Sequence, residues 1–157
     1  LYREIILDHY RTPRNSGELE SPPAKRAEGF NPLCGDEIVV SIDVRGDNVI
    51  SDIKISGQGC SISQSSASMM SVAIKGKKVS EALAIAKSFK QMMNIHEIGL
   101  EDETEVFHAE AETQLGDLEA LRGVVKFPVR IKCATLSWNT LTQAFQEDAQ
   151  NLTEPNR

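Results

Sequence analysis

Residues 38–55 read IVVSIDVRGDNVISDIKI, with apolar and polar side chains alternating on both sides of a central Gly-Asp-Asn. This alternation predicts two half-buried β-strands, and the Gly-Asp-Asn between them predicts a hairpin turn. Because cross-strand partners share one face of a sheet, the apolar residues indicate the register. A two-residue turn at Gly46-Asp47 follows from that register. The predicted pairs are Val44–Val49, Val40–Ile53 and Ile38–Ile55.

The predicted hairpin also places residues that can bind a metal. Continued past the strand ends, the register sets Cys34 opposite Gly59, and Cys60 is the next residue along the chain. We therefore expect Cys34, Asp36 and Cys60 to lie at one end of the sheet.

The rest of the chain is mainly helical in pattern. An early sheet followed by helices predicts one α+β domain over residues 1–157, with a small antiparallel sheet packed by helices. Residues 94–114 contain many carboxylates and no Lys or Arg, and we expect an acidic linker or insert there. A short edge strand is predicted near residues 25–30. The predicted helices are 1–10, 65–75, 81–93 with Ser80 as N-cap, 117–122 ending at Gly123, and one that follows Pro128.

Composition narrows the class of protein. At 157 residues with 40% hydrophobic and 25% charged residues, the chain is long enough for one ordinary globular core. A net charge of −6 argues against nucleic acid as a partner. An apolar run of about 18 residues, as needed to cross a bilayer, is not found, so a membrane is not expected. Three cysteines are an odd number, which favours a reducing compartment, and we expect the cytoplasm.

The cysteines have the surroundings of metal ligands. Cys34 and Asp36 flank a glycine, whereas Cys60 follows a glycine-rich loop and precedes a predicted helix. Cys133 lies near the predicted start of the last helix, where the helix dipole is expected to lower the pKa of its thiol. Three thiolates and one carboxylate suit tetrahedral Zn²⁺.

The residues alone leave other interpretations open. Free cysteines are often buried as inert core residues, and three scattered ones need not meet. His96 and His108 are expected to be solvated side chains of the acidic segment, and His9 a surface or capping residue of the first helix.

Three sequence boxes carry a resemblance to a known family. The boxes NPLCGD (31–36), GQGCSIS (57–63) and FPVRIKCATL (127–136) are similar to the three cysteine boxes of the IscU/SufU family, which is related to the NifU N-terminal domain. The resemblance covers almost the whole chain. It implies iron–sulfur cluster assembly, a three-stranded antiparallel sheet packed by helices, and metal ligands gathered at one exposed end. The implied ligands are Cys34, Asp36, Cys60 and Cys133.

Within that family the chain resembles the SufU branch more than the IscU branch. IscU scaffolds have a His immediately before the third cysteine, where this chain has Lys132, and a Leu-Pro-Pro-Val-Lys segment that this chain lacks. The SufU resemblance implies a zinc-dependent, sulfurtransferase-like partner of a SufS-type cysteine desulfurase. Cys34 would leave the zinc and accept persulfide sulfur, while Arg130 and Lys132 would offset the negative charge of the ligands. The alternatives are a scaffold for a [2Fe–2S] cluster and a structural zinc module.

Overall fold

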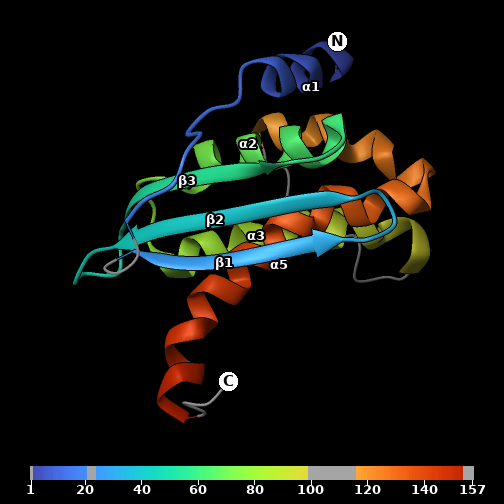
Figure 1. Cartoon of the computed structure of the whole chain (residues 1–157). Coiled ribbons are helices and arrows are strands. Elements are labelled where there is room, and N and C mark those ends of the chain that lie inside the picture. The colour runs from blue at the N-terminus through green and yellow to red at the C-terminus, as the bar shows by residue number, and fades with distance from the viewer. Residues whose placement is uncertain (1, 21–23, 99–115, 154–157) are drawn as a thin grey trace.

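The computed structural model describes residues 2–20, 24–98 and 116–153 and confirms the predicted α+β class. The part of the acidic segment from residue 99 to 114 lies outside the described residues, as does His108. Figure 1 shows the elements in chain order. They are α1 (Tyr2–Arg11), β1 (Lys25–Asn31), β2 (Asp36–Val44), β3 (Ile50–Gln58), α2 (Ser61–Ile74), α3 (Val79–Ile98), the 3-10 helix η1 (Gly116–Lys126) and α5 (Pro128–Thr153).

The sheet has the strand order β1-β2-β3, and both pairings are antiparallel. Helices α2, α3 and α5 cover one of its faces, and α1 lies beyond β3, against α2 (Figure 1). The alternation of β2 explains this layering, because Ile38, Val40 and Ile42 all point into the core and are almost completely buried.

The predicted hairpin register is wrong by two residues. Val40 pairs with Ile55 and Ile42 with Ile53. The turn accounts for a shift of one residue. It has three residues instead of the predicted two, because Asn48 adopts a left-handed φ of 64°. The other shift comes from a bulge beside Asp43, where the partner number changes by one. Two one-residue shifts restore the same faces, so apolar alternation could not reveal them.

Several helix ends also differ from the prediction. Helix α2 begins at Ser61, directly after its N-cap Cys60, rather than at residue 65. Ser80 lies inside α3 rather than capping it, and α3 extends to Ile98, so the first residues of the predicted acidic segment are helical. The 3-10 helix η1 runs through Gly123 instead of ending there. The start of α5 at Pro128 agrees with the prediction, since proline is favoured at a first helical position.

His9 is buried, contrary to the expectation of a surface or capping residue. Its Nδ1 lies 2.8 Å from the Ser68 hydroxyl oxygen on α2, which also accepts the Arg14 N–H at 2.9 Å. Burial, followed by the nearby Arg14 charge, holds the pKa of His9 below its usual range. These contacts fasten α1 and the residues after it to α2.

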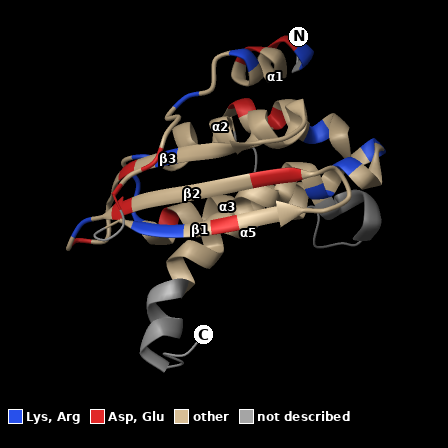
Figure 2. Cartoon of the chain, in the orientation of Figure 1, with Lys and Arg blue, Asp and Glu red and all other residues tan. Residues whose placement is uncertain are grey.

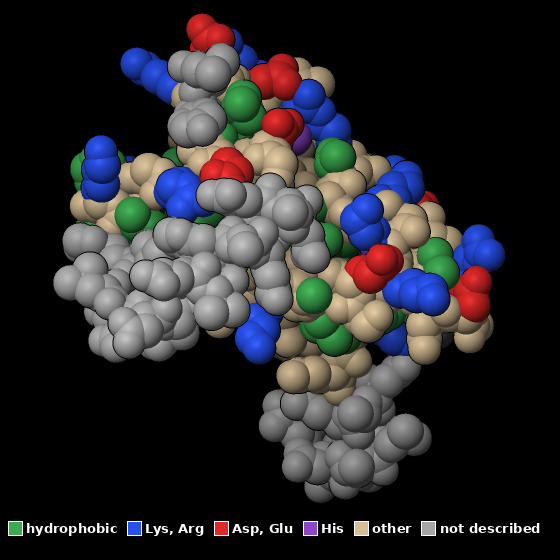
Figure 3. Space-filling view, turned by 180° about the vertical axis from the view of Figure 1, so that it is seen from behind, with side chains coloured by type: hydrophobic (Ala, Val, Ile, Leu, Met, Phe, Trp, Pro, Cys, Tyr) green, Lys and Arg blue, Asp and Glu red, His purple; other side chains and the backbone are tan. Residues whose placement is uncertain are grey.

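Charged side chains are distributed unevenly. On the helical side, seen in Figure 3, Lys and Arg lie among Asp and Glu with small apolar areas between them. Lys and Arg residues are frequent where η1 is followed by α5 (Figure 2), a region that includes Lys126 and Arg130. None of the described helices combines the length and hydropathy that crossing a bilayer demands.

Candidate metal centre

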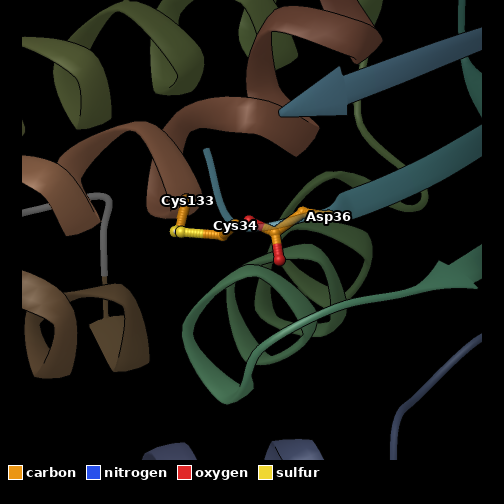
Figure 4. A group of neighbouring side chains, drawn as sticks. All are labelled: Cys34, Asp36 and Cys133. Carbon is orange, nitrogen blue, oxygen red and sulfur yellow. The ribbon is translucent and has the colours of Figure 1, made fainter. Parts of the chain in front are cut away.

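Three of the predicted ligands meet at one end of the sheet. One ligand atom from each of Cys34, Asp36 and Cys133 lies within 4.8 Å of the other two. Figure 4 shows these three side chains side by side. The Cys133 thiol donates to the Cys34 sulfur at an Sγ–Sγ distance of 3.3 Å. Cys34 is in the β1–β2 loop, Asp36 is the first residue of β2, and Cys133 is in the second turn of α5. Asp36 and Cys133 are buried, whereas Cys34 is half-buried.

Cys60 lies at the margin of this cluster. Its backbone N–H donates to Asp36 Oδ1 at 2.9 Å, and its thiol is close enough to Cys133 and Arg130 to form hydrogen bonds with them. The negative charge of Cys60 is the main cause that raises the pKa of Arg130. The structure therefore brings Cys60 to the predicted end of the sheet, although its sulfur is outside the tight set of three.

The two basic residues predicted to balance the ligands are placed differently. Arg130 interacts with the thiols, whose charges and hydrogen bond raise its pKa. Lys132 is an exposed residue of α5. Of the two basic residues, Arg130 is therefore the one whose charge interacts with the thiols.

Two glycines make room for the ligands. Gly35, between Cys34 and Asp36, has a φ of 72°, a conformation that side chains with a Cβ rarely adopt. A Cβ on Gly59 would lie 2.5 Å from Asp36 Oδ1 and 2.6 Å from Ser63 Oγ. Only glycine at position 59 thus lets the Asp36 carboxylate reach the N-terminus of α2.

Asn31 is a buried residue of the site whose role the sequence did not indicate. Its side-chain amide donates to Asp36 Oδ2 at 3.2 Å and to Cys133 Sγ at 3.6 Å. Its side-chain carbonyl accepts the N–H of Leu33 at 3.3 Å. An Asn at the start of a turn often accepts a hydrogen bond from the residue two positions on, and that pattern was the available signal.

The pKa values of the two buried ligands, Asp36 and Cys133, are shifted in opposite directions. Burial alone would raise the pKa of Asp36, but hydrogen bonds, first from the Cys60 N–H and then from Cys133, Asn31 and Ser63, outweigh it and lower that pKa. Burial and the neighbouring Cys34, Asp36 and Cys60 raise the pKa of the Cys133 thiol. The expectation that a helix start would lower the Cys133 pKa is therefore wrong, because burial beside other anions dominates.

The donor set fits a zinc ion. Tetrahedral Zn²⁺ with Zn–S bonds of about 2.3 Å separates its sulfurs by about 3.8 Å. The 3.3 Å between Cys34 and Cys133, and the 4.8 Å limit of the tight set, lie close to that separation. A cation also deprotonates the thiols that bind it, which would offset the raised pKa of Cys133. Cys34, Asp36, Cys60 and Cys133 are the residues that would hold the ion.

Comparisons with known proteins agree with this chemistry. The family described as the NifU-like N-terminal domain matches residues 1–134. The chain is 45% identical over 148 residues to the zinc-dependent sulfurtransferase SufU of Bacillus subtilis, covering 94% of this chain and 91% of the relative. It is 42% identical to the iron–sulfur cluster assembly scaffold protein IscU of Streptococcus pyogenes, covering 99% and 91% of the two chains.

A solved structure has the same fold. It is a putative iron–sulfur cluster assembly scaffold protein for the SUF system from Fervidobacterium islandicum. It superposes with a TM-score of 0.74 at 34% identity and covers 88% of this chain and 92% of that one.

Proposed function

This chain belongs to the family of NifU-like N-terminal domains, and we propose that it acts in iron–sulfur cluster assembly as a zinc-dependent sulfur acceptor. The observation that carries the proposal is an asymmetry among the thiols. Cys34 and Cys60 are both half-buried, but Cys34 lies in the β1–β2 loop, whereas Cys60 is fixed as the N-cap of α2 and Cys133 is buried in α5 beside Asp36. A sulfur acceptor needs an accessible thiol that can move while the other ligands stay fixed, and Cys34 is the accessible thiol that lies in a loop.

Cys34 is the residue that would take the sulfur. Bound Zn²⁺ would keep the thiols deprotonated near neutral pH. The Cys34 thiolate attacks the outer sulfur of a persulfide on the donor enzyme, a new S–S bond forms on Cys34, and the donor's cysteine leaves as a thiolate. Cys133 and Asp36 stay in place behind Cys34, because both are buried and hydrogen-bonded.

A groove beside the thiols offers the donor a docking surface. The groove has a volume of about 950 Å³ and lies between α1, α2, η1 and the start of α5. Its described charged residues are Arg3, Lys126 and Arg130, all basic, although the chain as a whole has a net charge of −6. Exposed Phe127 and Val129 contribute apolar surface next to them. We propose that a SufS-type cysteine desulfurase in the cytoplasm docks here, and that downstream assembly proteins receive the sulfur.

A cluster scaffold is the second candidate. The Streptococcus pyogenes relative is named a scaffold protein, and thiolates with a carboxylate also suit a [2Fe–2S] cluster. Lys132 stands where scaffold relatives were expected to have a histidine, which favours the acceptor role. Metal content of protein purified without oxygen separates the two, because a scaffold would contain iron and sulfide in equal amounts. A purely structural zinc module would take up no sulfur at all.

The test of the acceptor role compares three serine variants with a SufS-type desulfurase. Cys34→Ser removes the nucleophile but leaves Asp36, Cys60 and Cys133 to hold zinc more weakly. Cys60→Ser and Cys133→Ser remove ligands at the start and in the second turn of helices, and should lose zinc and activity together. Zinc per chain and cysteine-dependent sulfide release are measured for each variant. Appreciable sulfur transfer by the Cys34 variant would show that another cysteine is the acceptor.

A further inference from the structure

Asn31 uses every polar atom of its side chain within the metal centre. It is the last residue of β1, pairs with Asp36 across the sheet, and is only 5% exposed. Its NH₂ group has two donors, which are directed to Asp36 Oδ2 and Cys133 Sγ, and its carbonyl accepts the Leu33 N–H. One amide therefore contacts two of the predicted ligands and the loop that carries a third.

The Asn31 side chain has hydrogen bonds to Asp36, Cys133 and Leu33, and none to the Cys34 thiol among the described contacts. The Asn31 backbone oxygen accepts the Gly35 N–H at 2.8 Å, which closes the loop with Cys34 near its tip. Among the described contacts, the hydrogen bond of the Cys34 thiol is the one from Cys133. The space around Gly35 is open, with no atom within 4 Å of an added Cβ. The loop is thus anchored at its base, and the described hydrogen bond of its cysteine is the one from Cys133, a thiol that would lose its proton on binding a metal.

We propose that Asn31 is a positioning residue that determines which thiolate leaves the metal. A charge-assisted hydrogen bond stabilises a thiolate where it is, so the amide retains Cys133 and Asp36 in the ligand set. Cys60 has the Arg130 guanidinium beside its thiol, whereas Cys34 has neither hydrogen bond and is the sulfur that departs. The inference rests on the proposed function, because it assumes that a ligand is exchanged, and it adds the residue that makes the exchange selective.

The test measures the reactivity of each cysteine in zinc-loaded protein. Iodoacetamide is added, and the alkylation of Cys34, Cys60 and Cys133 is followed over time by mass spectrometry of peptides. In the wild type, Cys34 should react about tenfold faster than Cys133 or more. In Asn31→Ala this ratio should fall by about tenfold, because Cys133 loses its donor. Zinc release to a chromogenic chelator should then follow the alkylation of Cys133 as well as that of Cys34.

A second variant distinguishes a loss of selectivity from a loss of the fold. Asn31→Ser keeps a short hydroxyl that can still accept the Leu33 N–H, but it cannot reach Asp36 and Cys133 together. It should retain the turn and still lose the selectivity. Asn15→Ala is the matched control, because it removes an amide donor to Ser71 Oγ at 2.9 Å, on a partner outside the cluster. Its melting temperature should fall while the ratio of cysteine reactivities stays unchanged.

The possible results test the role of Asn31 separately from the proposed role of Cys34 as sulfur acceptor. A wild type in which Cys34 reacts no faster than Cys133 would overturn the acceptor role and this inference with it. A selective wild type with equally selective Asn31 variants would overturn the inference alone. A uniform rise at all three cysteines, equal to that in Asn15→Ala, would reduce Asn31 to a merely structural residue.

Discussion

The two ends of the β2–β3 hairpin differ in how strictly their geometry is fixed. At the turn end, a three-residue loop and a bulge displace the register by two residues from the simplest pairing. Ile50 is buried there in place of the predicted Val49, while Ile53 and Ile55 stay on the predicted face. At the cluster end, Asp36 is held by the Cys60 N–H, and an added Cβ on Gly59 would collide with it. Burial of apolar side chains tolerates sliding by two residues, whereas a site built from directed bonds tolerates none.

Removing zinc should have the largest effect, and it should be confined to the cluster end. The proposed ligands lie on the hairpin, at the start of α2 and in α5, so a bound metal would contribute to folding as well as to function. If several kcal/mol are lost, the melting temperature should drop by about 10 °C or more. Calorimetry of chelator-treated protein measures the drop. Hydrogen exchange should rise at residues 31–36 and change little at 45–49.

An unchanged melting curve in protein confirmed to lack zinc would contradict the structural part of this prediction. Faster exchange at both ends of the hairpin would show that the two ends unfold as one unit.

Zinc affinity should depend steeply on pH. The raised pKa of Cys133 means that its thiol keeps its proton near neutral pH until the metal displaces it. Protons therefore compete with zinc, and affinity must rise as pH rises. With two to three thiols losing protons, the affinity should rise about a hundredfold or more per pH unit between about pH 6 and 8. Competition with a chelator of known affinity measures the slope.

A pair of Gly→Ala substitutions compares the two ends directly. Gly59→Ala places a Cβ 2.5 Å from Asp36 Oδ1, so it should cost about 1–3 kcal/mol and weaken zinc binding about tenfold. Gly46→Ala at the turn has no atom within 4 Å of the new Cβ and should stay within about 0.5 kcal/mol of the wild type. Urea unfolding and zinc titration are measured on both. Equal effects of the two substitutions would remove the distinction between the ends.

Local patterns predicted what depends on local physics. Period-two alternation located β2 and β3, and Pro128 marked the start of α5. The strand register could not be predicted in the same way, because the left-handed Asn48 and the bulge beside Asp43 shift the pairing without changing the alternation of apolar residues in β2. The hydrogen bond from Asn31 to Cys133 spans 102 residues of sequence and exists only because α5 packs against β1. The pKa of Cys133 was mispredicted for a similar reason, since burial depends on tertiary packing rather than on position in a helix.

The smallest expected effect belongs to the residue that caused half of the register error. Asn48 has a φ of 64°, a conformation that glycine adopts without steric cost. Its backbone N–H donates to the Arg45 oxygen and its backbone oxygen accepts the Val79 N–H, so substitution removes neither bond. Asn48→Gly should therefore change stability by about 0.5 kcal/mol or less, whereas Asn48→Ala should cost about 1 kcal/mol. Thermal unfolding measures both, and zinc affinity should equal that of the wild type in each. A loss of zinc affinity in Asn48→Gly would show that strain at the turn is transmitted along β2 and β3 to the thiols, and the two ends would have to be treated as one coupled structure.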